Sequence, residues 1–357
     1  MKKWLSPALL VITFLLSAAG HFLGWNFTLQ FILSAISVIF VAGFLGKATE
    51  SVAHYAGQRL GGFLNATFGN AAELIIAILL VKQGLYDMVK ASITGSIIGN
   101  LLLVLGLSVF AGGLKFKIQK YNVTLAGLNG SLMILGIIAL FIPAVFLNTH
   151  SITESDTKFL SLVVAGILIV AYLAWLLFSM ITHKDYLNDV SNDGEQEELA
   201  HEHAPTWSKG RSILYLVVAT VMVAFVSEWL VGVLEPVSHE YGLSELFVGA
   251  FLVAIVGNAA EHSAAIMLAM KNKIGAAVEI AVGSSLQIAL FVAPVLVFIS
   301  FFMGDTMDIV FTTIELVAIG VAVFIAKSIT QDGATNWYEG LMLLAVYVIL
   351  GFSFYLV

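Results

Sequence analysis

The pentapeptide Gly69-Asn70-Ala71-Ala72-Glu73 recurs as Gly257-Asn258-Ala259-Ala260-Glu261, 188 residues further along the chain. Each copy is followed at the same distance by a Gly-Ser pair, Gly95-Ser96 in the first half and Gly283-Ser284 in the second. Three matches in the same order with nearly constant spacing are typical of an internal repeat. The third match is a pair of acidic residues that precede the two copies: Glu50 and Glu228.

The composition is that of a membrane protein. Of the 357 residues, 60% are apolar and 11% are charged, and the mean hydropathy is +0.99. In a soluble domain about a quarter of the residues are charged. Soluble enzymes, nucleic-acid-binding proteins and disordered proteins are therefore disfavoured. The net charge of −7 gives no reason to expect a nucleic acid partner. The absence of cysteine excludes disulfides and thiolate metal sites.

The apolar segments are long enough for helices that cross a bilayer. A window of about 20 residues gives eleven spans, near 6–23, 27–46, 64–82, 88–112, 121–147, 159–181, 212–234, 244–270, 275–301, 308–326 and 338–356. The runs are too long for the strands of a barrel, so helices are the spanning elements that fit. We therefore expect an all-α polytopic membrane protein surrounded by the lipid bilayer.

The repeat and the span count together define the organisation. We expect four parts: an extra N-terminal transmembrane helix in 1–25, a first five-helix repeat in 26–181, an acidic linker in 182–210 and a second five-helix repeat in 211–357. Because five is odd, the second repeat enters the membrane from the opposite side, so the repeats are inverted. Inverted repeats place a substrate site near the bilayer midplane. The first span also fits a signal peptide, but we expect an uncleaved helix.

The basic residues favour one orientation. With the amino terminus in the cytoplasm, 13 of the 16 Lys and Arg residues fall on the cytoplasmic side, and three fall outside: Lys82, Lys90 and Lys158. This is a strong positive-inside bias. We expect a cytoplasmic N-terminus, a C-terminus on the outer side, and a location in the cell membrane.

Two repeated carboxylates lie well inside predicted spans. An ionisable group there costs about 2.5–3.5 kcal/mol on insertion scales, so a symmetric pair, Glu73 and Glu261, indicates function. For one such residue alone, a protonated, hydrogen-bonded Glu would be as reasonable. Each Glu follows an Asn by three residues, which puts a carboxylate and an amide on one helical face. Oxygen ligands of this kind suit hard divalent cations such as Ca²⁺.

Charge balance suggests how the pair works. Two carboxylates are neutralised by one Ca²⁺ or by two protons, and leaving both bare inside a membrane is unfavourable. A site that must hold one or the other couples the two ions. This reasoning favours a cation/proton exchanger over an enzyme, although by itself it does not separate an exchanger from a channel.

The repeated segments, from Gly69 to Ser96 and from Gly257 through His262 to Gln287, resemble the two signature repeats of the calcium/proton exchanger family of the calcium/cation antiporter superfamily. The resemblance covers nearly the whole chain, including the extra first helix and the acidic linker. Sodium/calcium exchangers carry Ser- and Pro-rich signatures where this chain has Asn and Ala. The resemblance implies export of cytosolic Ca²⁺ in exchange for H⁺, with Ca²⁺ as the transported substrate and no cofactor.

The resemblance also implies roles for individual residues. The central Ca²⁺ ligands would be Glu73 and Glu261, assisted by Asn70 and Asn258. Two carboxylates and a histidine would serve the proton pathway: Glu50, Glu228 and His262, although His262 has no counterpart in the first half and is equally well explained as a structural residue. The residues that would line the site are Gly69, Gly257, Ser96, Ser284 and Gln287. Asn100 approximately takes the place of Gln287 in the first half, with an offset of 187.

The linker contains seven acids: Asp185, Asp189, Asp193, Glu195, Glu197, Glu198 and Glu202. A solvated acidic helix is the simplest interpretation, and a weak cation attractor is the alternative. An EF-hand is rejected, because Ala200 stands where the loop requires a bidentate Glu.

Other interpretations stay open. The substrate of an exchanger could equally be Mn²⁺ or another divalent cation, and Na⁺ could replace H⁺, since oxygen ligands alone separate these ions poorly. An intramembrane hydrolase using Glu261 and His262 has no need of a symmetric second Glu. Glu315 lies in the predicted tenth span, where Thr312 and Thr313 can hydrogen-bond it, and we interpret it as structural. The sequence is compatible with a homo-oligomer but does not determine one.

Overall fold

The protein is described by a computed structural model over residues 2–149, 153–183 and 207–357. The first part of the chain forms α1 (Lys2–Phe22), α2 (Phe27–Phe68), α3 (Ala71–Lys82), α4 (Tyr86–Ile98), α5 (Leu105–Phe116), α6 (Val123–Asn148) and α7 (Glu154–Leu177). The second part forms α10 (Lys209–Tyr241), α11 (Glu245–Phe247), α12 (Ala254–Met270), α13 (Ile274–Gln287), α14 (Ala293–Met303), α15 (Thr313–Thr330) and α16 (Trp337–Tyr355).

Short π-helical segments join several of these helices into longer rods. They are η1 (Gly99–Val104) between α4 and α5, η2 (Phe178–Thr182) after α7, η3 (Val248–Val253) between α11 and α12, and η4 (Ile288–Val292) between α13 and α14. The segments η1 and η4 follow the two Gly-Ser pairs at equivalent places in the repeats. Such π segments inside α-helices frequently occur at functional sites.

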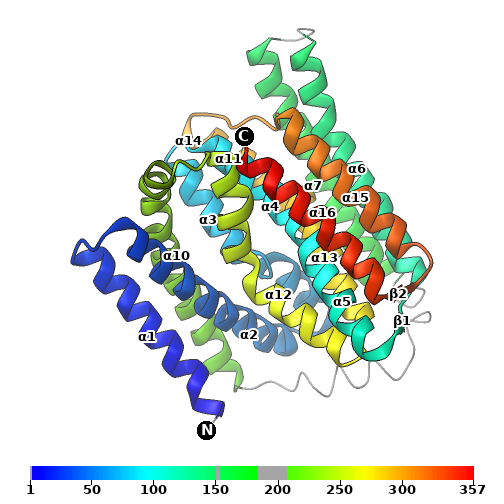
Figure 1. Cartoon of the computed structure of the whole chain (residues 1–357), viewed down its shortest axis with the longest axis horizontal. Coiled ribbons are helices and arrows are strands. Elements are labelled where there is room, and N and C mark those ends of the chain that lie inside the picture. The colour runs from blue at the N-terminus through cyan, green and yellow to red at the C-terminus, as the bar shows by residue number, and fades with distance from the viewer. Residues whose placement is uncertain (1, 150–152, 184–206) are drawn as a thin grey trace.

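The expected all-α polytopic architecture is confirmed. Within the described ranges, nine helices are long and apolar enough to cross a membrane. Two further stretches complete the predicted eleven: α1, whose apolar part Pro7–Phe22 is shorter, and the third span, which is interrupted. The two ends of the chain lie on opposite faces of the molecule (Figure 1).

The prediction of one continuous third span over 64–82 is wrong. The helix α2 extends past its predicted end at 46, kinks at Gly57 and stops at Phe68, and α3 begins at Ala71. Gly57 has φ 78° and ψ 171°, a conformation that glycine adopts without steric cost. The chain breaks again at Gly69 and Asn70, two residue types that disfavour helix interiors. The first signature segment therefore contains a helix break.

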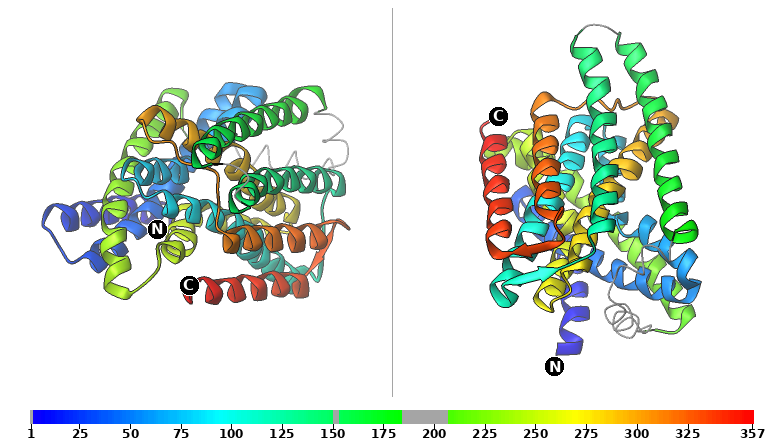
Figure 2. Two further views of the ribbon diagram at one scale, coloured as in Figure 1. Left: turned by 90° about the horizontal axis from the view of Figure 1, so that it is seen from above. Right: turned by 90° about the vertical axis from the view of Figure 1, so that its right-hand side faces the viewer.

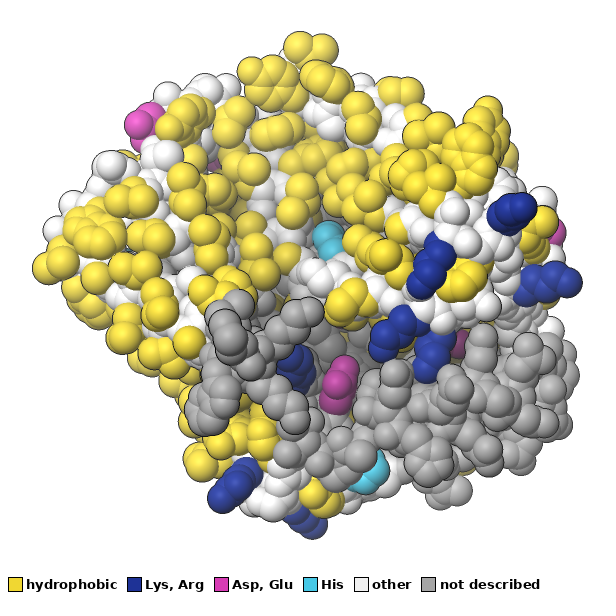
Figure 3. Space-filling model, turned by 60° about the horizontal axis from the view of Figure 1, so that its bottom comes forward, with side chains coloured by type: hydrophobic (Ala, Val, Ile, Leu, Met, Phe, Trp, Pro, Cys, Tyr) yellow, Lys and Arg dark blue, Asp and Glu magenta, His cyan; other side chains and the backbone are white. Residues whose placement is uncertain are grey.

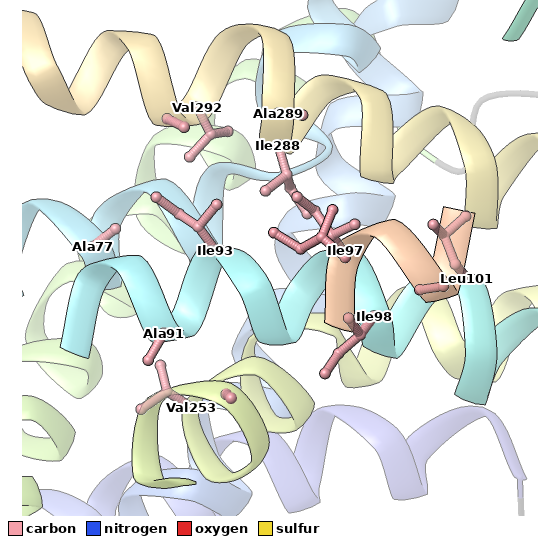
Figure 4. Packing of buried hydrophobic residues seen from close by; sticks show 14 of the residues in the cluster. Ala77, Ala91, Ile93, Ile97, Ile98, Leu101, Val253, Ile288, Ala289 and Val292 are labelled. Atoms are coloured by element: carbon pink, nitrogen blue, oxygen red, sulfur yellow. The ribbon is translucent and has the colours of Figure 1, made fainter. Parts of the chain in front are cut away.

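The helices are arranged in two flanks around a central group. On one flank α1 and α10 pack along α2, and on the other α6 and α7 form a hairpin that projects beyond the remaining helices (Figures 1 and 2). Between them, α4 is almost completely enclosed. Its apolar side chains, including Ile93, Ile97 and Ile98, meet residues of η3 and η4 such as Val253 and Ile288 (Figure 4).

One face of the molecule carries a group of six lysines, and we call it the lysine-rich face. It comprises Lys115, Lys117, Lys120, Lys271, Lys273 and Lys327, and Figure 3 shows Lys and Arg side chains gathered there. Two short strands that were not predicted, β1 (Ile118–Lys120) and β2 (Ala334–Asn336), pair antiparallel at this face. Gln119 of β1 donates hydrogen bonds to the Ala269 carbonyl oxygen (2.9 Å) and to Asn272 Oδ1 (3.0 Å), which ties the strand to the end of α12.

Candidate functional site

The two signature segments meet in the middle of the molecule, but they differ in backbone conformation. In the first repeat, Asn70 lies at the break before α3, with φ −97° and ψ 26°. In the second repeat, Asn258 lies inside the continuous helix α12. Both side chains are buried, with 2% and 1% of their surface exposed. Identical sequences therefore take two local structures, and the difference must come from what each segment packs against.

Each signature asparagine is hydrogen-bonded to the serine of the other repeat. The Ser284 hydroxyl of α13 donates to Asn70 Oδ1 over 2.8 Å. In the symmetric position, Asn258 Nδ2 donates to the Ser96 hydroxyl of α4 over 3.0 Å. The predicted partners thus come together, and they do so crosswise, so that the centre of the molecule is built from both repeats.

Two further amides complete this network. Asn70 Nδ2 donates to Gln287 Oε1 at the end of α13. Asn100, at the corresponding place in η1, donates to Asn258 Oδ1 over 3.5 Å and to the Ser284 hydroxyl over 3.1 Å. Asn100 therefore takes the position in the first repeat that Gln287 takes in the second, as the approximate sequence match suggested.

The two signature carboxylates flank this network. Glu73 and Glu261 are close enough for electrostatic repulsion between their carboxyl groups, and Ser284 lies beside the Glu261 carboxyl group. Glu73 also packs on the other repeat, since a Cβ on Gly257 would lie 3.3 Å from Glu73 Cγ. The absence of a side chain at Gly257 leaves room for the Glu73 carboxylate.

Buried polar atoms beside the carboxylates lack partners. Glu261 Oε2 and His262 Nε2 are shielded from solvent and have no hydrogen-bond partner in the structure. A buried unpaired polar atom is costly, so these atoms mark a place suited to an ion or a proton. No group of three or more His, Asp or Glu side chains with metal-ligand spacing occurs among the described residues. A cation here would need amide or backbone oxygens in addition to the two carboxylates.

The other predicted proton-pathway residues lie outside this network. Glu50 of α2 and Glu228 of α10 both have exposed side chains. Their helices pack against each other, with a 2.8 Å hydrogen bond between the Ser51 and Ser212 hydroxyls. Neither carboxylate has a hydrogen bond to the central amides.

Glu315 has the structural surroundings expected from the sequence. Its Oε2 accepts hydrogen bonds from the Thr312 amide and hydroxyl, each over 2.8 Å, which caps the start of α15. Its Oε1 faces the Thr94 hydroxyl of α4 over 3.4 Å. The seven linker acids and the rejected EF-hand sequence lie outside the described residues.

One acidic residue on this side of the molecule was not anticipated. Glu279 is an exposed residue of α13, inside the predicted span 275–301. A signal was present, because its counterpart 188 residues earlier is Ala91. Glu279 does not recur in the other repeat, so the repeat pattern gave no reason to single it out.

Comparisons with known proteins agree with this architecture. A family model described as "Sodium/calcium exchanger protein" matches residues 26–181 and 211–356. The chain is 47% identical to "Ca(2+)/H(+) antiporter ChaA" of Bacillus subtilis, over 96% of both chains. It is 46% identical to a "Ca(2+)/H(+) antiporter" of Synechocystis, over 95% of this chain and 94% of the relative.

Solved structures show the same arrangement of helices. The structure titled "Structure of native YfkE" superimposes with a TM-score of 0.85 and 43% identity, covering 99% of this chain and all of the other. The "H+/Ca2+ Exchanger CAX" superimposes with a TM-score of 0.68 over 98% of this chain and 92% of the other, at 13% identity. At that identity, the second likeness concerns the fold alone.

Proposed function

The chain belongs to the calcium/proton exchanger family of the calcium/cation antiporter superfamily, and we propose that it exports cytosolic Ca²⁺ in exchange for H⁺ by alternating access. The site is a midplane cation site formed by the two Gly-Asn-Ala-Ala-Glu repeats. The observation that carries this proposal is the pair of crosswise contacts, Asn70 with Ser284 and Asn258 with Ser96. They support a site to which both repeats contribute, since each signature asparagine contacts a serine of the other repeat.

In this proposal Glu73 and Glu261 share one Ca²⁺. Their mutual repulsion and partial burial disfavour two bare charges, and either one divalent cation or protons removes that repulsion. Asn70 and Asn258 assist through their amide oxygens. Each of these oxygens already accepts one hydrogen bond, and a carbonyl-type oxygen has a second lone pair available for a cation.

Ser96, Ser284 and Gln287 orient these ligands. The hydroxyls and the Gln287 amide hydrogen-bond the two asparagines directly, so they line the site without contributing charge. Gly69 and Gly257 leave space at the break and beside Glu73, respectively. Backbone carbonyls near the break at Gly69 are further candidate ligands, because Ca²⁺ takes about 6–8 oxygens.

Protons reach the site through groups that are not central ligands. Glu50 and Glu228 are exposed carboxylates on two packed helices, and in this proposal they belong to the proton pathway. His262 follows Glu261 in the chain and its buried Nε2 has no hydrogen-bond partner, and in this proposal it serves the proton pathway. The lysine-rich face is the cytoplasmic face in this proposal, with the protein in the cell membrane, because basic residues favour that side.

The test is transport by the purified protein in lipid vesicles with an imposed pH gradient. Uptake of ⁴⁵Ca²⁺ should require the gradient, and it should disappear in Glu73→Gln and Glu261→Gln while Glu245→Gln, an exposed carboxylate at the start of α11, transports normally. Competition by Mn²⁺ decides the alternative that another divalent cation is the substrate, and replacement of the pH gradient by a Na⁺ gradient decides the alternative of Na⁺ coupling. Ca²⁺ flux that neither gradient drives would contradict an exchanger and indicate a channel.

A further inference from the structure

Two glycines allow the repeats to touch backbone to backbone on the face opposite the lysines. Gly95 of α4 lies directly on η3, since a Cβ at Gly95 would be 2.0 Å from the Ala250 carbonyl oxygen. Gly249 of η3 also lies directly on α4, since a Cβ there would be 2.7 Å from the Met88 carbonyl oxygen and from Ala91 Cβ. We call this contact of α4 with η3 the closed crossing. Distances this short leave no path for an ion between the two helices.

The inverted repeat provides the same residues a second time. Gly283 of α13 is the counterpart of Gly95, and Gly61 is the counterpart of Gly249, each 188 residues away. Here the environment is different. An added Cβ at Gly283 would have nothing within 4 Å, and Gly61 packs instead on its own helix, where a Cβ would be 2.4 Å from the Ala53 carbonyl oxygen. We call α13 and residues 58–68, which are equivalent in sequence to α4 and η3, the open crossing.

Exposure of the two equivalent helix faces agrees with this difference. On α13, a stripe from the lysine-rich face to the cation site is at least partly exposed: Ala276, Glu279, Ile280, Gly283 and Gln287. Three of the four counterparts on α4 are buried, namely Met88, Ala91 and Gly95, with Ser92 as the exception, and Asn100 of η1, which takes the place of Gln287, is buried as well. Gln287, at the end of the exposed stripe, hydrogen-bonds Asn70. The face of α13 that leads to Gln287 is therefore uncovered along its length, whereas the equivalent face of α4 is covered.

We propose that Gly95 and Gly283 are the two closing points of the access paths, and that the structure holds the path to the lysine-rich face open. This inference rests on the proposed alternating access. When access changes sides, residues 58–68 turn about the kink at Gly57 and leave Ala53. Gly61 and Gly283 then pack as Gly249 and Gly95 pack in the closed crossing, and α4 separates from η3.

Two alanine substitutions, Gly283→Ala and Gly320→Ala, should have different effects on exchange. Gly283→Ala adds a methyl group to open space in this structure, so folding and Ca²⁺ binding from the lysine-rich side should persist. In the alternate state, the same methyl group would meet a carbonyl oxygen, as a Cβ at Gly95 would in this one. Gly283→Ala should therefore hold the protein in the state described, and exchange should fall by about tenfold or more, because overpacking against backbone excludes the closed crossing. Gly320→Ala, also in open space on α15, is the matched control and should exchange normally.

The chain has no cysteine, which makes single-cysteine labelling a direct readout. Met88→Cys and Ala276→Cys occupy equivalent positions, the first fully buried at the closed crossing and the second partly exposed at the open one. In lipid vesicles, a thiol reagent should modify both cysteines when the protein turns over. Combined with Gly283→Ala, it should modify Ala276→Cys under all ion conditions and leave Met88→Cys protected. With Gly95→Ala, which clashes in this structure, the protection pattern should reverse.

Either of two results would overturn this inference: Gly283→Ala exchanging Ca²⁺ at the wild-type rate, or alternating protection of both cysteines in that variant. Failure of the wild-type protein to couple Ca²⁺ and H⁺ would defeat the proposed function instead. Should Gly95→Ala not fold, the Gly283→Ala result decides the inference without it.

Discussion

The Ser284 hydroxyl on α13 donates a 2.8 Å hydrogen bond to the amide oxygen of Asn70 at the break before α3. The break in the first repeat is thus held by a side chain of the second repeat. Asn258, in a continuous helix, has the symmetric bond to Ser96 and a second one to the Ala254 carbonyl oxygen, one turn earlier in its own helix. Both signature asparagines therefore have hydrogen-bond partners, although the backbone is broken at Asn70 and helical at Asn258.

Removing the Ser284 hydroxyl should destabilise the protein more than removing its neighbour. Ser284→Ala leaves a buried amide oxygen with one partner fewer, at a cost of about 1–3 kcal/mol. Ser285→Ala is the control, because Ser285 is equally buried but bonds only the Ala281 carbonyl oxygen of its own helix, which keeps its helical partner. Denaturation in detergent measures both. Equal losses of stability in the two variants would show that the hydrogen bond between the repeats stabilises the protein no more than a bond within one helix does.

Adding a methyl group at Gly257 should disturb Glu73. In Gly257→Ala the new Cβ would lie 3.3 Å from Glu73 Cγ, so the carboxylate must shift by a few tenths of an ångström. We expect Ca²⁺ affinity to fall about tenfold, because a ligand set tolerates little displacement. Equilibrium ⁴⁵Ca²⁺ binding checks this. Gly232→Ala on α10, where a Cβ has open space, should bind like the wild type, and unchanged binding in both variants would contradict the packing argument.

Glu50 and Glu228 should affect protons rather than cation binding. Both side chains are exposed and are not bonded to the central amides, so Glu50→Gln and Glu228→Gln should preserve Ca²⁺ binding. Exchange should slow and its pH dependence should change, because a protonatable group on each route is lost. Stopped-flow measurement of exchange against pH tests this. A wild-type profile in both variants would leave Glu73 and Glu261 to carry both ions alone.

The seven linker acids should act through long-range attraction. Their field is screened over about 8 Å at physiological ionic strength. Neutralising all seven to Asn and Gln should raise the apparent KM for Ca²⁺ on the lysine-rich side at low salt and change it little at high salt. If KM at low salt is unaffected, the linker is only a tether between the repeats.

The sequence specified the fold well because its strongest signals are long. Eleven apolar runs and two copies of a pentapeptide predict eleven helices and a central site. The pair Ser96 and Ser284 follows from the constant offset of 188, and Gln287 follows from the family resemblance. The crosswise contacts of Asn70 with Ser284 and of Asn258 with Ser96 are consistent with inverted repeats, in which equivalent residues face one another across the centre.

The asymmetry between the repeats could not be predicted. Gly69-Asn70 breaks a helix, whereas Gly257-Asn258 continues one, and a local sequence that is identical cannot encode two outcomes. The two copies differ in their flanking residues and in their surroundings, since Gly95 lies against η3 whereas a Cβ at Gly283 would have open space. The short strands β1 and β2 were missed for a related reason, because three residues each give no periodic signal.

The most direct test of the shared cation site is proton release when purified protein binds Ca²⁺ in weakly buffered detergent solution. Metal ligands must be deprotonated to bind, so binding releases protons. Our account predicts that the wild-type protein releases up to about two protons per Ca²⁺, and that Glu73→Gln and Glu261→Gln each lose both Ca²⁺ binding and the release. Normal Ca²⁺ binding with unchanged proton release in the double variant would contradict a site in which these two carboxylates hold either the cation or the protons.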